Sequence, residues 1–352
     1  MVLFNIETPP NKFLCRTFAG CNNGYMEKKN ILKGVVFVGI GASIYGMLAT
    51  FVKMSYKEGF TTSEVTTAQF VMGFVGLLIL NFIQTITSKK TLASPSSKEI
   101  KMLMLAGTSL GCTSLFYYLS VQYINVSIAI VLLMQSVWFS VVVESFLTKK
   151  LPTLRKVISV CIVLLGTVLA TNLINLEVAI DWHGIFWGLL ASASFTMTMF
   201  TSNTLATGLP VLRKSIIMLS GGSVIILLFL FFAQIGPLHS ESLKSFYLNF
   251  TENTQHIRPF DYSIFWKYGL ILALFGTIIP PILFNLGFPN TGLGLGSIIS
   301  SLELPVSVTM AFVLLSEKVI LIQWIGIVLI LFAIVLMNLP SKKEKPLEEQ
   351  LS

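Results

Sequence analysis

Long apolar runs separated by short polar segments make up the chain from residue 31 to residue 339. A membrane-spanning helix needs about 20 predominantly apolar residues, because each residue advances the helix by about 1.5 Å. Ten runs approach this length, and the connections between them are short except for 236–265. The ten runs cover residues 31–53, 65–87, 101–123, 126–147, 155–175, 184–206, 212–235, 266–288, 292–316 and 319–339. This pattern predicts an all-α membrane protein with ten transmembrane helices.

The composition agrees with a membrane protein and gives the basic residues a topological role. Of the 352 residues, 54% are hydrophobic and 11% are charged, against about 25% charged in an ordinary soluble domain. The formal net charge of +8 comes from Lys and Arg between the apolar runs, so it signals orientation rather than nucleic-acid binding. With the N-terminus inside, 18 of the 24 Lys and Arg residues lie on the inner side. The positive-inside rule then predicts a multi-pass protein of the plasma (inner) membrane with both termini cytoplasmic.

The polar ends of the chain are expected to lie outside the helical bundle. Residues 1–30 lack the long apolar core of a cleavable signal peptide, so we expect a disordered cytoplasmic segment there. Translation could start at Met1 or at Met26, which begins a short basic lead into the first apolar run, and both starts stay open. Residues 340–352 are rich in charge and are expected to form a cytoplasmic tail.

A weak internal repeat divides the chain into two halves. GIGASIYGMLATF at 39–51 and GLLASASFTMTMF at 188–200 share small residues in the same order, and the fourth and ninth runs correspond at an offset of 168 residues. Each half, 31–175 and 184–339, then contains five helices. Because five is odd, the halves must have opposite topology, which predicts two inverted five-helix repeats. Inverted repeats are common in secondary transporters, which bind their substrate near the midplane between the halves.

The ninth run contains a single acid, Glu303, about 12 residues from either end, which places it near the midplane. An ionised carboxylate at that depth costs roughly 2.5–3.5 kcal/mol on the insertion scale, so such residues usually mark a substrate or ion pathway. The alternative is a hydrogen-bonded acid that only joins neighbouring helices. Gln135 is the repeat equivalent of Glu303, because it lies 168 residues earlier and is also near mid-helix. We expect the two side chains on opposite walls of one central cavity.

Four further side chains are candidates for the substrate pathway. Ser43 and Ser192 lie in the small-residue stretches of the first and sixth runs, which allow helices to pack closely or to line a cavity. Tyr45 and Trp138 are aromatic residues of the first and fourth runs, where packing is the alternative to ligand contact.

Three prolines are expected to act as hinges. Pro280 and Pro281 are consecutive in the eighth run and should kink or break that helix. Pro305 cannot donate a backbone hydrogen bond and should open the ninth helix beside Glu303.

Residues that would support other classes of function are absent from the apolar runs. The three histidines, His183, His239 and His256, lie in loops or at a helix edge, so the sequence predicts no histidine-based nucleophile pair and no HExxH zinc site in the membrane. No Asp lies in any run, which removes the paired acids of an aspartyl enzyme. We therefore expect no enzymatic activity, no catalytic residue, no metal site and no cofactor. A receptor or scaffold without transport, and less favoured an intramembrane enzyme, stay as alternatives.

The sequence resembles the EamA-type branch of the drug/metabolite transporter superfamily over residues 31–339. The resemblance rests on the layout of the ten runs, on YLSVQYINVSIAIVLLMQSVW at 118–138 and on SSLELPVSVTMAFVLLSEKVILIQWIGIVLIL at 300–331. Its most specific features are the acid and proline of the ninth run, the Glu at that run's end, and the Trp-x-Gly of the tenth run. The fourth run departs from the pattern because it lacks a midspan proline.

This resemblance implies a carrier that moves small metabolites across the membrane, often outward. We therefore expect a secondary transporter that works by alternating access, with an amino-acid-like solute and efflux as the leading candidates. The expected partners are a small-molecule substrate and the lipid bilayer, with protons as the candidate coupling ion and no nucleic acid. The resemblance leaves the solute open, because the branch spans amino acids, sugars, nucleosides and drugs, and the sequence does not define an oligomeric state.

Overall fold

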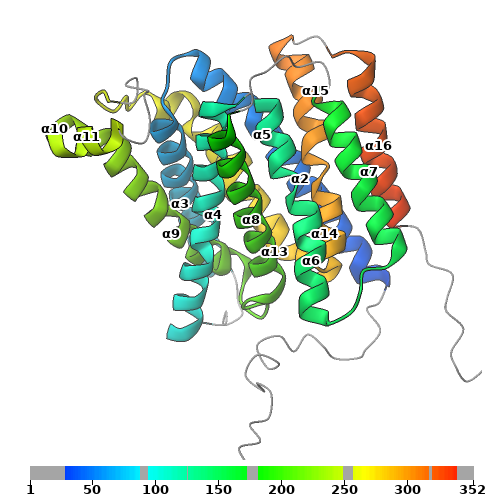
Figure 1. The fold of residues 1–352 in the computed structure, drawn as a ribbon. Coiled ribbons are helices and arrows are strands. Elements are labelled where there is room, and N and C mark those ends of the chain that lie inside the picture. Colours follow the sequence, from blue (N-terminus) through cyan, green and yellow to red (C-terminus); the bar gives the residue numbers. More distant parts are fainter. Residues whose placement is uncertain are drawn as a thin grey trace, which may run out of the picture.

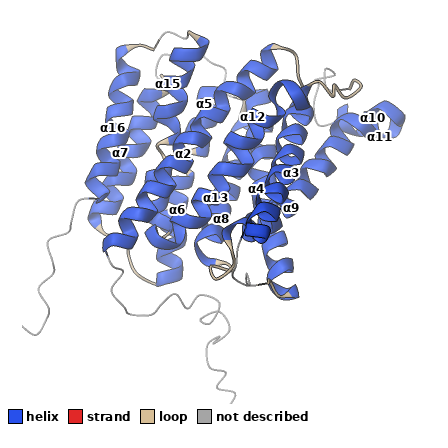
Figure 2. Ribbon diagram, turned by 180° about the vertical axis from the view of Figure 1, so that it is seen from behind, coloured by secondary structure: helices blue, strands red, loops and turns tan. Residues whose placement is uncertain are grey.

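The computed structural model describes residues 28–87, 94–124, 126–172, 181–248, 257–316 and 319–338. Within these ranges the chain forms helices and no strand, which confirms the predicted all-helical class. Figures 1 and 2 show one bundle of long helices, with α7 and α16 side by side at one edge. The first described helix begins three residues before the predicted first run. The expectations for the N-terminal segment before Lys28, including the choice of start, and for the 340–352 tail concern residues outside these ranges.

The first half of the chain contributes six helices. They are α2 (Lys28–Lys57), α3 (Thr62–Thr87), α4 (Ser97–Tyr123), α5 (Val126–Leu133), α6 (Ser136–Thr148) and α7 (Leu154–Ala170). The second half contains more elements because two of its long helices include π-helical turns. They are α8 (Trp182–Thr204), α9 (Val211–Leu230), η2 (Phe231–Ile235), α10 (Gly236–His239), α11 (Glu241–Leu248), η4 (Phe265–Gly269), α12 (Leu270–Ala273), η5 (Leu274–Ile278), α13 (Ile279–Thr291), α14 (Leu293–Ser300), α15 (Glu303–Leu315) and α16 (Leu321–Asn338).

Eight helical stretches of the described chain are long and apolar enough to cross a membrane. They correspond to the first four predicted runs and to the sixth through ninth. The fifth and tenth runs form α7 and α16, of 17 and 18 residues, and these helices are shorter than the eight long stretches. The fold is therefore that of a multi-pass α-helical membrane protein.

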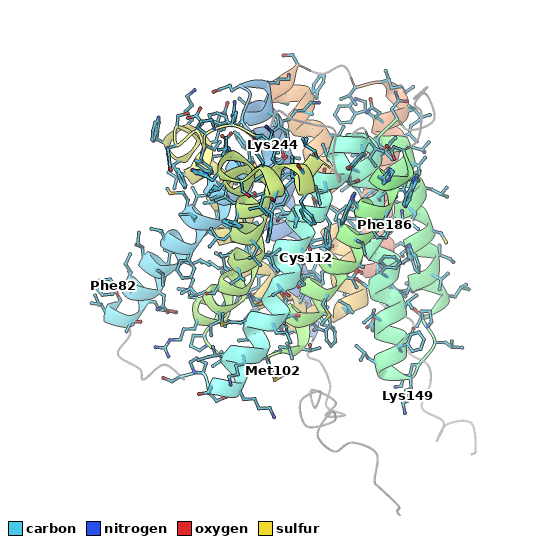
Figure 3. All side chains as sticks on the ribbon, turned by 60° about the vertical axis from the view of Figure 1, so that its left-hand side comes forward. Phe82, Met102, Cys112, Lys149, Phe186 and Lys244 are labelled. Carbon is cyan, nitrogen blue, oxygen red and sulfur yellow. The ribbon has the colours of Figure 1, made fainter. Side chains whose placement is uncertain are left out.

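The two ends of the bundle can be followed in Figure 3, where Lys149 and Lys244 lie at opposite ends. We call these the lower and the upper end, as they are drawn in Figure 1. The beginning of α2 and the end of α16 both lie at the lower end, with the end of α6 (Figure 1). The turns that follow α2 and α4 lie at the upper end.

The fourth and ninth runs are each broken near their middle. A short turn at residues 134–135 separates α5 from α6, and a turn at 301–302 separates α14 from α15. In both turns a backbone N–H reaches the carbonyl three residues earlier, as in Gln135 to Leu132 at 3.1 Å and Leu302 to Ile299 at 3.1 Å. The ninth run breaks beside Pro305, as predicted, whereas the fourth run breaks at the equivalent place without a proline.

The consecutive prolines of the eighth run do not end the helix. Pro280 and Pro281 occupy the first turn of α13, where a missing N–H is tolerated. The turn before them, η5, is π-helical, so the change from π to α geometry accommodates the two absent donors. The predicted interruption is therefore a change of helix type within a continuous helical stretch from Phe265 to Thr291.

The most extensive helix contacts all join the first half to the second. Helix α4 packs against α8 and α9, α2 packs against α13 and α15, and α7 packs against α16. Glycines permit the closest approaches, because a Cβ at Gly107 or Gly111 would clash with the backbone of Met218 or Gly222 on α9. The two halves thus interdigitate rather than form separate bodies.

Candidate functional site

A cavity lies between α2, α4, α5 and α15, and we call it the outer cavity. Its polar and aromatic lining comprises Tyr45, Lys53 and Tyr56 of α2, Thr113, Ser114, Tyr117 and Tyr118 of α4, and Glu303 and Ser307 of α15. Tyr56 and Val121 lie near the upper ends of their helices, so the cavity occupies the upper half of the bundle.

Glu303 lies at the inner limit of the outer cavity, as the first residue of α15. The break at 301–302 places the carboxylate at a helix N-terminus, where the helix dipole favours a negative charge. Its Oε2 atom is buried and has no hydrogen-bond partner within the described chain. A buried carboxylate oxygen without a partner is rare and costly, so this atom is available to a ligand, a water or a proton.

Tyrosines form much of the wall around Glu303. The Tyr117 and Tyr118 rings lie with their centroids 5.8 Å apart, and Tyr118 meets Tyr56 edge-on at 6.3 Å. The hydroxyl groups of Tyr56 and Tyr118 reach Thr62 and Gln69 of α3 at 3.3 and 3.5 Å. Aromatic faces attract cations, so this wall and Glu303 together suit a cationic or amine-bearing group.

A second cavity, which we call the inner cavity, lies on the lower side of Tyr45. Tyr45 and Thr113 line both cavities, and the Tyr45 ring stacks on Phe195 of α8 at 6.1 Å. The rest of the inner lining comes from α4, α8, α9, η5 and α13 and includes Thr198, Ser202, Ser215, Gly276, Pro280, Pro281 and Asn285. The stacked pair therefore stands between an outer and an inner compartment.

The structure does not place all the predicted pathway residues at these cavities. Tyr45 and Glu303 line the outer cavity, but its lining does not include Gln135. Gln135 instead accepts a hydrogen bond from Trp138 Nε1 at 2.9 Å, and Trp138 is 37% exposed. The expected placement of Glu303 and Gln135 on opposite walls of one cavity is thus not found in this conformation. The offset of 168 residues correctly matched the positions of the two residues along their runs, since both lie at a helix break. It carried no information about the face of the helix from which each side chain projects.

The two serines of the small-residue stretches also lie outside the lining of both cavities. Ser43 donates to the carbonyl of Gly39 at 2.8 Å, within its own helix. Ser192 is fully buried, and its hydroxyl has no partner among the residues described. Their position fits the close helix packing that was the alternative to a pathway role.

The prolines lie next to the cavities. Pro280 and Pro281 line the inner cavity, and Pro305 stands in the first turn of α15 beside Glu303. The backbone segments with missing donors therefore border the two cavities.

A buried acid at the upper end was not predicted. Glu64, in the first turn of α3, has no exposed surface. Its carboxylate accepts hydrogen bonds from Gln234 Nε2 at 3.1 Å, Arg258 Nη2 at 2.7 Å, and the backbone N–H groups of Thr61 and Asp261 at 2.7 and 2.9 Å. The sequence carried a signal for part of this cluster, since Thr61-x-x-Glu64 is a capping box.

An ion pair joins α6 and α7 near the start of α14, at the lower end. Lys156 of α7 donates to Glu144 of α6 at 2.6 Å. The pair lies directly against Gly294, where a Cβ would clash with both side chains. The start of α14 is thus packed against the ion pair that joins α6 and α7.

The fold is that of a multi-pass helical membrane protein, with two cavities lined by polar and aromatic side chains between its helices. The family described as the EamA-like transporter family matches residues 32–172 and 182–339. The chain therefore belongs to the EamA-like transporter family, which confirms the resemblance seen in the sequence and suggests a role in transport. No curated protein matches the chain significantly. A solved crystal structure superposes with a TM-score of 0.66 at 12% identity, covering 87% of this chain and 98% of that one, and this likeness shows the fold alone.

Proposed function

We propose that the protein is a secondary transporter that exports a small amino-acid-like metabolite across the plasma membrane. The observation that carries the proposal is the unpartnered carboxylate oxygen of Glu303 at the inner limit of the outer cavity. Lys53 lines the same cavity nearer its upper end. An acid and a base at two depths of one aromatic-walled cavity match the amine and carboxylate of a zwitterion.

The proposed architecture has ten crossings in two inverted five-helix repeats, with the lower end and both termini in the cytoplasm. Helices α7 and α16 supply the fifth and tenth crossings, because a helix of 17 or 18 residues reaches about 26 Å and a thin bilayer or snorkelling flanks can cover the remainder. The excess of Lys and Arg on the lower side supports this orientation.

The conformation fits the outward-open state of an alternating-access cycle. The outer cavity occupies the half of the bundle nearer the upper end, while the Lys156–Glu144 pair holds the lower end together. The breaks at 134–135 and 301–302 and the π-helical turn before Pro280 are points where helices can bend. Opening toward the cytoplasm would then require separation of that ion pair and displacement of Tyr45 from Phe195.

Transport from proteoliposomes tests the proposal. Vesicles loaded with a radiolabelled amino-acid mixture should release label faster with the protein than without it, and a proton gradient should change the rate. Glu303→Gln keeps the shape and hydrogen-bonding capacity of the side chain but cannot titrate, so it should fold normally and lose the response to the gradient. Normal gradient-driven release by Glu303→Gln would refute the coupling role. No release by the wild-type protein with any loaded solute would favour a receptor or scaffold.

A further inference from the structure

The inner cavity contains a buried amide that the Glu303 site does not explain. Asn285 of α13 is 5% exposed and lines this cavity. Its Nδ2 donates to Ser215 Oγ of α9 at 3.0 Å, while its Oδ1 has no hydrogen-bond partner in the described chain. One end of the amide is therefore fixed and the other end is unsatisfied. Buried polar atoms are almost always paired, so an unpaired acceptor on a cavity wall indicates a missing donor.

The surroundings of Asn285 define which donor fits. Thr113, Thr198, Ser202 and Ser215 bring hydroxyl groups from α4, α8 and α9 to the cavity, and none of its described lining residues is charged. The lining thus offers neutral hydrogen-bonding groups and no carboxylate to neutralise a cation. A charged group would lose its hydration here without gaining a counter-charge. A hydroxyl or carboxamide is neutral, and hydrogen bonds to these side chains can replace the ones that it loses to water.

A buried lysine lies close to the inner cavity but does not contact Asn285 Oδ1. Lys214 is 2% exposed and neighbours the lining residue Ser215. Its ammonium group donates to the carbonyl of Ser202 at 2.9 Å, near the C-terminal end of α8. This position suits a lysine side chain that caps a helix C-terminus. Lys214 therefore does not supply the donor that Asn285 Oδ1 lacks.

We propose that the inner cavity is a second solute-binding site and that Asn285 Oδ1 accepts a hydrogen bond there from an uncharged hydroxyl or carboxamide group. The proposal rests on the transport function proposed above and narrows the solute to one that carries such a group. The Tyr45–Phe195 stack separates this site from the outer cavity. Glu303 serves the outer site, and Asn285 serves the inner site.

Cysteine labelling tests the inner site directly. Ser202→Cys, in a protein from which the native cysteines have been removed, places a thiol in the cavity without disturbing the Asn285–Ser215 contact. The probes are 2-hydroxyethyl methanethiosulfonate and its near-isostere n-propyl methanethiosulfonate, added to the cytoplasmic side of inverted vesicles. Met197→Cys is the matched control, because Met197 lies on the same helix and is 46% exposed on the bundle surface.

The measured preference is the labelling rate with the hydroxyethyl reagent divided by the rate with the propyl reagent. We expect this ratio to be about tenfold greater at position 202 than at position 197, which is equivalent to one added hydrogen bond. Asn285→Leu should remove this preference at 202 and leave 197 unchanged. If Asn285→Leu does not yield a monodisperse protein, Asn285→Ala serves the same purpose. Equal preferences at both positions, absence of labelling at 202, or a preference that survives loss of Asn285 would overturn the inference.

The outcome separates this inference from the proposed transport function. Labelling reports on the cavity without requiring net transport, and Glu303→Gln should leave the preference at position 202 intact. Normal transport without the preference would remove only the inner site. If the preference at position 202 is found but no transport is measured, only the proposed transport function is contradicted.

Discussion

Arg258 donates a hydrogen bond to Glu64 at 2.7 Å and so joins two residues 194 positions apart. The acid lies in the first turn of α3, and the arginine lies in the segment before η4. Gln234 of η2 donates to the same carboxylate, so three separate parts of the chain meet on one side chain. Because all four donors converge at the upper end, this cluster holds residues 258–261 against the start of α3 and does not line either cavity.

Removing the acid should destabilise the upper end. Glu64→Leu leaves the side chains of Arg258 and Gln234 and two backbone N–H groups without their acceptor, so we expect the free energy of unfolding to fall by about 3 kcal/mol. The measurement is thermal unfolding of the purified protein in detergent. Glu241→Gln is the control, because it breaks an exposed ion pair with Lys244 at 3.5 Å and should leave the unfolding temperature unchanged. Equal unfolding temperatures for Glu64→Leu and the wild type would contradict this account.

The paired prolines of the eighth run should set the rate of transport rather than stability. Replacing Pro280 and Pro281 by Ala restores two backbone donors and allows regular α-helix to extend through η5. We expect normal membrane insertion and at least a severalfold slower turnover, measured as initial rates in proteoliposomes. Pro289→Ala is a matched control, since that proline lies in the same helix α13 and does not line either cavity. Unchanged rates in the double variant would remove the reason to place movement at this turn.

Opposite labelling of the two ends tests the orientation. Ser97 begins α4 at the lower end, and Ser240 follows α10 at the upper end. Single cysteines at these positions should react with a membrane-impermeant maleimide from opposite sides of intact cells, Ser240→Cys from outside and Ser97→Cys only after permeabilisation. Reaction of both from outside would exclude the inverted arrangement.

A pH effect is expected from an acid outside the membrane-spanning stretches. Hydrogen bonds from Tyr268, at 2.5 Å, and from Lys267, at 3.1 Å, hold the pKa of Glu58 below its usual value of 4.5. A depressed pKa means that the stabilisation is present above pH 4.5 and is lost as the pH falls through the lower folded-state value. The unfolding temperature should therefore fall less between about pH 6 and pH 3.5 in Glu58→Gln than in the wild type. An identical fall in both proteins would show that this contact does not contribute.

The apolar pattern could predict the helical class, because membrane helices are defined by length and by exclusion of charge. Glu303 indeed borders a cavity, and the helix does break beside Pro305. The direction of a side chain around its helix depends on neighbours from the other half, which the pattern does not encode. Gln135 illustrates this limit, because its repeat position matched Glu303 while its side chain contacts Trp138.

Contacts between segments far apart in the chain also could not be predicted from the sequence pattern. Thr61-x-x-Glu64 signals a helix start, but the role of Arg258 depends on a loop that returns to α3 only in the folded chain. The break between α5 and α6 had no proline to mark it. Asn285 reads as one polar residue in an apolar run, and its significance comes from the unsatisfied oxygen that only the packed structure shows.

The interdigitation of the two halves has a consequence for how the protein is made. Helices α2 to α7 are synthesised before α8 and α9. At that stage the face of α4 that carries Gly107 and Gly111 has no partner helix to pack against. Helices α2 to α7 are therefore expected to associate only loosely in the lipid until α8 and α9 have been inserted. A chain that stops after α7 would present this unfinished surface to quality-control proteases, whereas two half-length chains synthesised together in one cell could find each other and assemble.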